Sequence, residues 1–212
     1  MANFDAQIQD LVGTAMTDQA AMDTFMSDGL AQLYRLLPPS KLAECSTSTT
    51  LSNSPTTLDL DTVTIGPVIN VVRKTSKGYS QICRKIHASM SSRITDPNDL
   101  MHVTETDPVY FINNAVLNVY PDPTATQTAD VYYLPLTSID ASGGSTIDNL
   151  SNDMTYVVVL YAAVRAAEAL LAEEEDAELY VPMINSLKQD YAQALQTIGS
   201  TMPKPKRETN ES

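Results

Sequence analysis

The sequence predicts an α+β fold in which a small helical bundle carries a β-rich insertion and an extended C-terminal tail. Two amphipathic segments open the chain within residues 1–40. Short apolar and aromatic segments punctuated by proline and asparagine fill the middle of the chain, as is typical of antiparallel strands. An alanine-rich helical hairpin follows at residues 151–199. We expect the first two helices and this hairpin to pack together as the bundle.

The N-terminal segment contains two helical patterns. Apolar side chains recur every three or four residues from the start of the chain, which predicts a first helix over residues 3–16. Asp18 is a good N-cap residue for a second helix, and Pro38-Pro39 are expected to end it. A Ser/Thr-rich segment without periodicity follows, so residues 41–57 are expected to be a linker, either a loop or an extended edge.

Residues 58–140 are expected to be β-rich. Apolar and β-branched residues favour three strands in the first part of this region. Gly66-Pro67 and Lys77-Gly78 are expected to provide the turns between them. The expected strands are residues 58–61, 68–72 and 79–86.

A three-stranded meander is expected in the second part of the β-rich region, between residues 105 and 135. Asn113-Asn114 separates the first two strands, and asparagine tolerates the positive φ of a two-residue hairpin turn. Pro121 and Pro123 are expected to end the second strand, because proline has no N–H to donate to a sheet.

The C-terminal hairpin follows a glycine-containing loop at residues 141–150. Alanine dominates its first helix, so a neighbouring helix can approach closely. Pro182 is expected in the first turn of the second helix, where its missing N–H is tolerated, and Gly199 just past the helix end. The second helix has an apolar side chain at every fourth position, namely Leu179, Met183, Leu187, Tyr191 and Leu195.

Charge is strongly segregated along the chain, whose net charge is −13. Residues 1–34 carry five acidic and no basic residues, and residues 94–150 carry eight acidic and no basic residues. Residues 35–93 carry eight basic residues against three acidic ones. This pattern fits either ordinary solvated surface or a head-to-tail ring contact between a basic and an acidic face. The basic residues expected at that subunit interface are Arg73, Lys74, Lys77, Arg84 and Lys85.

The net negative charge of the chain disfavours nucleic-acid binding by the basic segment, because such a chain repels phosphate groups at long range. An acidic lining suits a channel through which DNA slides without sticking.

The sequence contains none of the common motifs for phosphate binding, dinucleotide binding, metalloprotease or serine hydrolase activity. No phosphate-binding loop, dinucleotide fingerprint, H-E-x-x-H or G-x-S-x-G motif occurs. Cys45 and Cys83 lack metal-ligand spacing and are expected to be reduced, buried thiols, while His87 and His102 stand alone. A Ser–His–Asp arrangement of distant residues is not excluded by a sequence, but nothing favours one here. We therefore expect no catalytic site, no metal site, no cofactor and no enzyme.

The N-terminal residues lack the basic and apolar regions of a signal peptide. The longest apolar run, residues 156–164, is far shorter than the roughly 20 residues that a membrane span needs. The sequence therefore predicts a soluble protein, made in the cytoplasm, without a membrane partner.

The proline and aromatic pattern of the meander, followed by Y-x-x-x-x-Y-A-x-x-R-A-x-E, resembles the head-to-tail connector (adaptor) proteins of tailed bacteriophages. The segment GLAQLYRLLPPSKL is similar to the second helix of that family, which ends at a proline. The resemblance covers most of the chain and consists of packing and turn patterns rather than reactive residues. The matching positions are Asp107, Pro108, Tyr110, Phe111, Leu117, Val119, Tyr120, Pro121, Pro123, Val131, Tyr132, Tyr133, Pro135, Tyr156, Tyr161, Ala162, Arg165, Ala166 and Glu168.

The resemblance implies a virion structural protein of the neck, assembled in the host cytoplasm. Copies would form a dodecameric homo-oligomer ring beneath the portal protein, line the DNA channel and present a platform for a downstream neck or tail protein. Phage DNA would pass through without specific contacts. Two other interpretations stay open: another neck or tail-completion ring, such as a tail terminator, and a non-viral binding module.

Residues 200–212 are expected to form an extended tail. Two prolines prevent a helix and no apolar residue follows Met202, so the segment cannot fold alone. The family that the chain resembles docks its C-terminal segment onto the portal, and a proline-stiffened segment loses little entropy on binding. The alternative is a dispensable, solubilising tail. The residues expected to dock are Met202, Pro203, Lys204, Pro205, Lys206 and Arg207.

Overall fold

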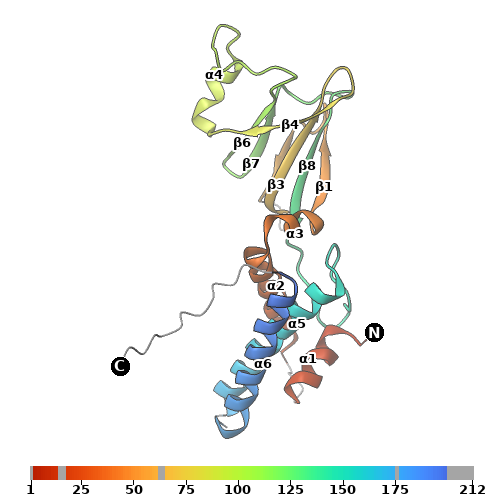
Figure 1. Ribbon diagram of the computed structural model, residues 1–212, viewed down its shortest axis with the longest axis vertical. Helices are drawn as coiled ribbons and strands as arrows, with labels where there is room; N and C mark the ends of the chain where they lie inside the picture. Colours follow the sequence, from red (N-terminus) through yellow and green to blue (C-terminus); the bar gives the residue numbers. More distant parts are fainter. Residues whose placement is uncertain (1, 14–17, 62–64, 175–176, 200–212) are drawn as a thin grey trace, which may run out of the picture. The chain divides into compact units, whose positions relative to one another are not determined.

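The computed structural model describes residues 2–13, 18–61, 65–174 and 177–199, and the fold is α+β, as predicted (Figure 1). The chain divides into two compact units. Unit 1 is helical and combines residues 1–44 with 138–212, whereas unit 2 consists of residues 45–137 and contains both sheets. The β-rich unit is therefore an insertion between the N-terminal helices and the C-terminal hairpin.

Unit 1 is built around one central helix, α5, which contacts α1, α2 and α6. Because these neighbours surround it, α5 is buried on most of its circumference, including four of its alanines. Gly29 of α2 permits one close approach: a Cβ atom there would lie 3.0 Å from Cδ1 of Tyr161. The helices are α1 (Phe4–Val12), α2 (Gln19–Leu36), α3 (Pro39–Glu44), α5 (Asn152–Glu174) and α6 (Ala177–Thr197).

The ends of the N-terminal helices follow local rules. The Asp18 side chain accepts a hydrogen bond from the N–H of Ala21 at 3.1 Å, so the predicted N-cap of α2 is confirmed. Pro38 ends α2, as predicted. The first helix is shorter than the predicted range of residues 3–16, because Gly13 adopts φ 75° and caps α1 after Val12. Residues 14–17 lie outside the described part of the chain.

One prediction for the second helix of the hairpin is wrong, and its apolar spacing does not coincide with its buried face. α6 begins at Ala177, so Pro182 lies inside the helix, on an exposed face. Leu179 is 53% exposed, whereas Tyr180 is 1% exposed and starts the buried face. A helix has 3.6 residues per turn, so a stripe at every fourth position drifts around it and leaves the core. Gly199 lies just past the helix end, as predicted, and adopts φ 76°.

The loop after unit 2 holds the start of α1. The N–H of Phe4 donates to the carbonyl of Gly144 at 2.8 Å, and the N–H of Asp5 donates to the carbonyl of Ala141 at 2.9 Å. The N–H of Ala141 in turn donates to the Asp23 carboxylate at 2.9 Å. The loop expected at residues 141–150 thus satisfies helix-end donors that would otherwise lack partners.

Unit 2 consists of two four-stranded sheets, in the orders β1-β8-β3-β4 and β2-β7-β6-β5. One hydrophobic core takes residues from both, including Val71 and Val131 from the first sheet and Leu117 from the second. The sheets therefore pack face to face. The strands are β1 (Thr47–Leu51), β2 (Thr57–Asp59), β3 (Ile65–Lys74), β4 (Ser80–Ile82), β5 (Arg84–Lys85), β6 (Val109–Asn113), β7 (Val116–Tyr120) and β8 (Ala129–Pro135).

A short helical segment covers the outer face of the second sheet. It comprises the 3₁₀ turn η1 (Ala88–Met90) and α4 (Ser91–Thr95). Ile94 of α4 packs with Val109 and Phe111 of β6, while Tyr110 faces the core between the sheets. Strand β6 is thus covered on both faces, which explains its unbroken apolar run.

The strand pairing decides one alternative that the sequence left open and corrects three strand predictions. The expected linker at residues 41–57 contains the end of α3 and all of β1, and β1 is an edge strand paired with β8, so the extended-edge alternative holds. Gly66-Pro67 is no turn but lies within β3, where the register shifts. A Cβ on Gly66 would lie 2.6 Å from the carbonyl oxygen of Leu134, so glycine permits this close strand approach.

The other two corrections concern where strands end. The strand expected at residues 79–86 divides at Cys83 into β4 and β5, which belong to different sheets. The meander turn lies one residue later than predicted, at Asn114 (φ 47°) and Ala115 (φ 59°). Asn113 pairs with Val116, so the ladder continues one residue beyond the expected strand end.

Candidate assembly surfaces

The predicted subunit-interface residues lie on two elements of unit 2. Lys74 ends β3 and Lys77 lies in the β3–β4 turn, where Gly78 adopts φ 81°. Arg84 and Lys85 form β5, the edge strand of the other sheet. These four side chains belong to exposed residues. The structure therefore brings the residues together in pairs, one pair on a hairpin and one on a sheet edge.

Arg73 is not a surface residue, although it was predicted with the other four. It is 1% exposed and lies on the same face of β3 as the core residue Val71. Alternation along the strand turns this face inward, and a sequence pattern of basic residues does not reveal it. Arg73 is therefore removed from the candidate interface.

The buried guanidinium of Arg73 instead joins β3 to the loop between β7 and β8. Its Nε donates to the carbonyl of Pro121 at 2.8 Å, and Nη2 donates to the carbonyl of Asp122 at 3.2 Å and to Oε1 of Gln127 at 3.0 Å. Burial lowers the pKa of Arg73, and the charge of Glu105 partly opposes this effect. Arg73 thus acts as an internal brace of unit 2.

The tip of the β3–β4 hairpin is held by its own hydrogen bonds. The N–H of Thr75 donates to the carbonyl of Tyr79 at 2.8 Å, and the N–H of Tyr79 donates to Oγ1 of Thr75 at 3.1 Å. Ser76 donates its N–H and its hydroxyl to the Glu105 carboxylate, at 2.9 and 2.7 Å. These bonds from Ser76 lower the pKa of Glu105. The tip is therefore a defined turn, supported by the loop that precedes β6.

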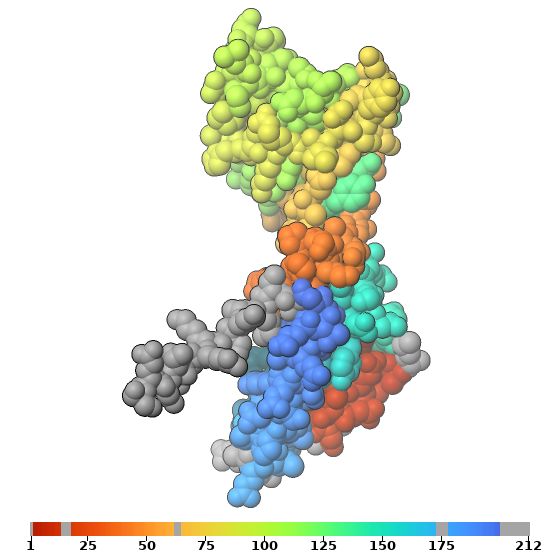
Figure 2. All heavy atoms as spheres, viewed as in Figure 1, coloured from red at the N-terminus to blue at the C-terminus, as the bar shows by residue number. Residues whose placement is uncertain are grey.

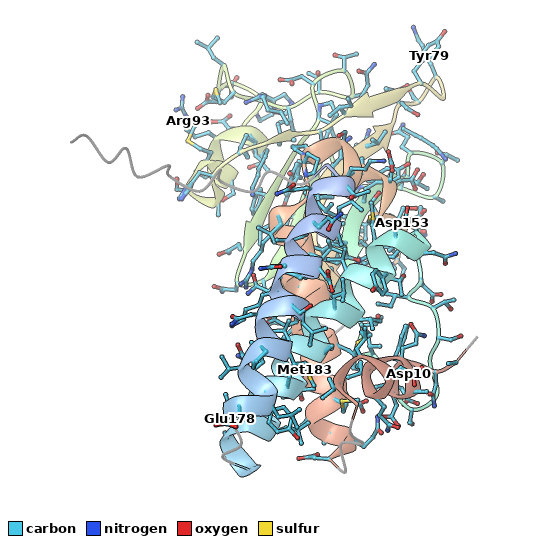
Figure 3. The ribbon with its side chains drawn as sticks, turned by 60° about the horizontal axis from the view of Figure 1, so that its bottom comes forward. Asp10, Tyr79, Arg93, Asp153, Glu178 and Met183 are labelled. Carbon is cyan, nitrogen blue, oxygen red and sulfur yellow. The ribbon has the colours of Figure 1, made fainter. Side chains whose placement is uncertain are left out.

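Two apolar side chains stand exposed on this hairpin. Tyr79 is 67% exposed and Ile82 is 71% exposed. Figure 3 shows Tyr79 projecting at the tip, and the yellow atoms of the hairpin project from unit 2 in Figure 2. Neighbouring exposed apolar side chains are candidates for a contact surface, and aromatic residues are enriched at such surfaces. Neither residue was predicted as a contact residue, although both lie within four residues after the Lys77-Gly78 turn.

Some basic side chains of unit 2 form ion pairs with carboxylates, and others do not. Arg84 lies 3.1 Å from the Asp107 carboxylate, and Arg93 makes two hydrogen bonds to Asp99, at 2.9 and 3.2 Å. Among the described residues, Lys74, Lys77 and Lys85 form no ion pair. These three lysines therefore carry exposed positive charge that no described ion pair compensates.

The two units differ strongly in charge. Unit 1 carries eighteen acidic and seven basic residues in its sequence, whereas unit 2 carries eight acidic and six basic ones. The negative charge of the chain is therefore concentrated in the helical unit, and the lysines on the hairpin and on β5 belong to the nearly balanced one.

The candidate chemical groups form no site in the described part of the chain. No three metal-ligating side chains gather among the described residues. Cys45 and Cys83 are buried thiols, and burial raises the pKa of Cys83 to about 12. His87 and His102 are exposed. The predicted portal-docking residues, Met202 to Arg207, lie outside the described residues.

One described helix is long and apolar enough, by length and composition alone, to span a membrane. It covers residues 152–172 of α5, with a mean hydropathy of 1.5. Of its most apolar window, 61% is buried inside the protein. The core helix of a soluble protein meets the same test, and α5 is the central helix of unit 1.

The family of the chain follows from a comparison with known protein families. The family model described as SU10 adaptor protein matches residues 3–210. The chain belongs to the SU10 adaptor protein family. The match spans both units, so the helical bundle and its β-rich insertion belong to one adaptor architecture. No curated protein matches the adaptor.

Membership confirms the resemblance to phage head-to-tail adaptors. An adaptor of this family is a phage virion component that associates with other capsid or tail components, and structural adaptors are typically not enzymes.

Proposed function

We propose that the adaptor is a head-to-tail connector protein whose copies form a dodecameric ring beneath the portal. The ring, assembled in the host cytoplasm, becomes part of the virion neck and joins the capsid to a downstream neck or tail protein. Family membership over residues 3–210 supports the adaptor role. The observation that carries the ring is the contrast between the exposed lysines of unit 2 and the acidic helical unit.

The proposed ring contact is heterologous: a basic surface of one subunit meets an acidic surface of the next, and the rotation closes. The basic surface comprises Lys74, Lys77, Arg84 and Lys85, with Tyr79 and Ile82 as its apolar part. Exposed ion pairs each contribute about 0–1 kcal/mol, so charge alone gives a weak contact. We therefore expect the portal to act as a template for ring closure.

The negative charge of the adaptor also supports passage of DNA without binding. A ring of chains that each carry −13 repels phosphate groups at long range. Such a lining lets DNA slide, whereas a basic lining would hold it through counterion release.

Charge reversal tests the ring contact. The double variant Lys77→Glu/Lys85→Glu is expected to reduce the number of adaptor copies bound per portal, because it replaces attraction to the acidic neighbour by repulsion. Native mass spectrometry of the adaptor mixed with portal measures this number. The control is Arg35→Glu/Lys41→Glu, which reverses two charges in unit 1. Wild-type occupancy of the portal by the Lys77/Lys85 variant would refute the proposed contact.

Truncation tests the docking role of the C-terminal tail. Deleting residues 201–212 is expected to leave unit 1 folded, because the described core ends before them, and to abolish attachment to the portal. The control deletion, residues 208–212, retains all six proposed docking residues and should bind normally. Co-purification with portal and the yield of infectious tailed particles measure the effect. If the longer deletion still binds portal and supports normal particle yields, the tail has no docking role.

A further inference from the structure

An open groove lies between the first turns of α5 and the last turns of α6. It has a volume of about 310 Å³. Asp153 and Tyr156 come from α5, Asp190 and Gln193 come from α6, and Ile198 follows the end of α6. Because the two helices form a hairpin, the start of one lies beside the end of the other. Figure 3 shows Asp153 at this end of the hairpin and Glu178 at the opposite end.

The groove is acidic and partly apolar. Neither Asp153 nor Asp190 forms an ion pair among the described residues, and no basic side chain lines the groove. The nearest basic residue along α6, Lys188, is engaged with Glu168 at 2.9 Å. Tyr156 is 48% exposed and supplies an apolar surface. The partial negative charge at the carbonyl end of α6 is offset by the partial positive charge at the start of α5, so the two aspartates supply the negative charge of the groove. A fitting occupant therefore carries basic groups together with apolar ones.

The C-terminal segment of the chain has this chemistry. Residues 202–207 read Met-Pro-Lys-Pro-Lys-Arg, so three basic residues alternate with or follow apolar ones. No acidic residue interrupts them. The prolines hold the backbone extended and reduce the entropy lost on docking.

The segment also has sufficient reach to dock in the same molecule. Gly199, with φ 76°, ends α6 next to the groove residue Ile198. Asp190 lies nine residues before Gly199, which is about 13 Å along a helix. An extended chain advances about 3.3 Å per residue, so five residues beyond Gly199 span this distance. Lys204 and the basic residues after it can therefore reach both carboxylates.

We propose that the α5–α6 groove binds residues 202–207 of its own chain when no portal is present. Lys204, Lys206 and Arg207 meet Asp153 and Asp190, and Met202 and the prolines pack against Tyr156 and Ile198. This inference goes beyond the proposed function, because it concerns the free chain. In the free adaptor the segment occupies its own acidic groove.

Disulfide trapping in the full-length chain tests this docking. We expect the pair Gln193→Cys/Pro205→Cys to form an intramolecular disulfide under mild oxidation. The control pair, Gln196→Cys/Pro205→Cys, places the same exposed residue type three positions along α6 but outside the groove. Because docking raises the effective concentration of the tail at position 193, trapping of the first pair should be at least about tenfold faster. The buried Cys45 and Cys83 do not compete.

Neutralising the two aspartates tests whether their charge holds residues 202–207 in the groove. Adding Asp153→Asn/Asp190→Asn to the first pair should reduce its trapping rate to that of the control pair. Adding Asp10→Asn/Asp28→Asn, two exposed acidic residues elsewhere in unit 1, should leave the rate unchanged. Equal rates for positions 193 and 196 would overturn the proposal, as would disulfides only between chains or a rate unaffected by the two asparagines in the groove. None of these outcomes depends on portal, so they are independent of the proposed function.

Discussion

Replacing Arg73 with methionine is expected to destabilise unit 2 by roughly 2–4 kcal/mol. Methionine fills much of the same space, but it leaves the carbonyl groups of Pro121 and Asp122 without their donor. Both bonds are part-buried, and an acceptor left without a partner costs about 1–3 kcal/mol where water cannot replace the donor. Relief from burying a charge offsets part of this loss, and the hydrogen bonds outweigh it because the guanidinium makes four of them.

Urea unfolding of the full-length variants measures the loss. Arg73→Lys should fall between wild type and Arg73→Met, since lysine retains the charge but not the planar fork of donors. Lys74→Met is the matched control, because Lys74 is the next residue and is exposed, so its effect should lie within about 0.5 kcal/mol. A wild-type or higher stability of Arg73→Met would show that desolvation outweighs the hydrogen bonds.

Leu187→Ala is expected to cost unit 1 about 2–5 kcal/mol, the range for removing a leucine side chain from a packed core. Leu187 is 5% exposed and lies on the buried face of α6 with Tyr180, Ile184 and Leu195. The cost combines the lost burial of three carbon atoms with the cavity that they leave.

Leu179 supplies a control on the same helix. Leu179→Ala makes the same chemical change at a side chain that is 53% exposed, so we expect less than about 0.5 kcal/mol. The free energy of unfolding of both variants, from the same denaturant titration, compares the two sites directly. A loss below about 1 kcal/mol for Leu187→Ala would contradict its placement in the core.

Much of the fold follows from local rules that the sequence displays. Asp18 caps α2 and Pro38 ends it because a helix start needs an acceptor and a proline cannot donate. Gly78 and Gly199 occupy positive φ, which glycine adopts without strain. The bundle, the β-rich insertion and the adaptor resemblance could be predicted for the same reason. Helical periodicity, turns and the positions of proline and glycine are properties of short segments.

Other features depend on which segments pair. Residues 79–86 have one continuous β pattern, but pairing with β3 and with β6 assigns its halves to different sheets. Gly66-Pro67 has the composition of a turn, yet the approach of Leu134 places it inside a strand. The apolar side chain at position 179 fits a helical stripe, but only the neighbouring helices define which face of α6 is buried.

The candidate surfaces divide in the same way. The basic block at residues 73–85 and the basic, proline-containing tail were evident from the sequence, because charge is a property of composition. Only the tertiary structure separated buried Arg73 from exposed Lys74 and Lys77, and brought Asp153 and Asp190 to one groove from positions 37 residues apart. The sequence by itself determined the order of the helical and β-rich segments, several of their caps and the resemblance to the family. The packing of distant segments decided burial and proximity, because both arise from contacts that no local pattern encodes.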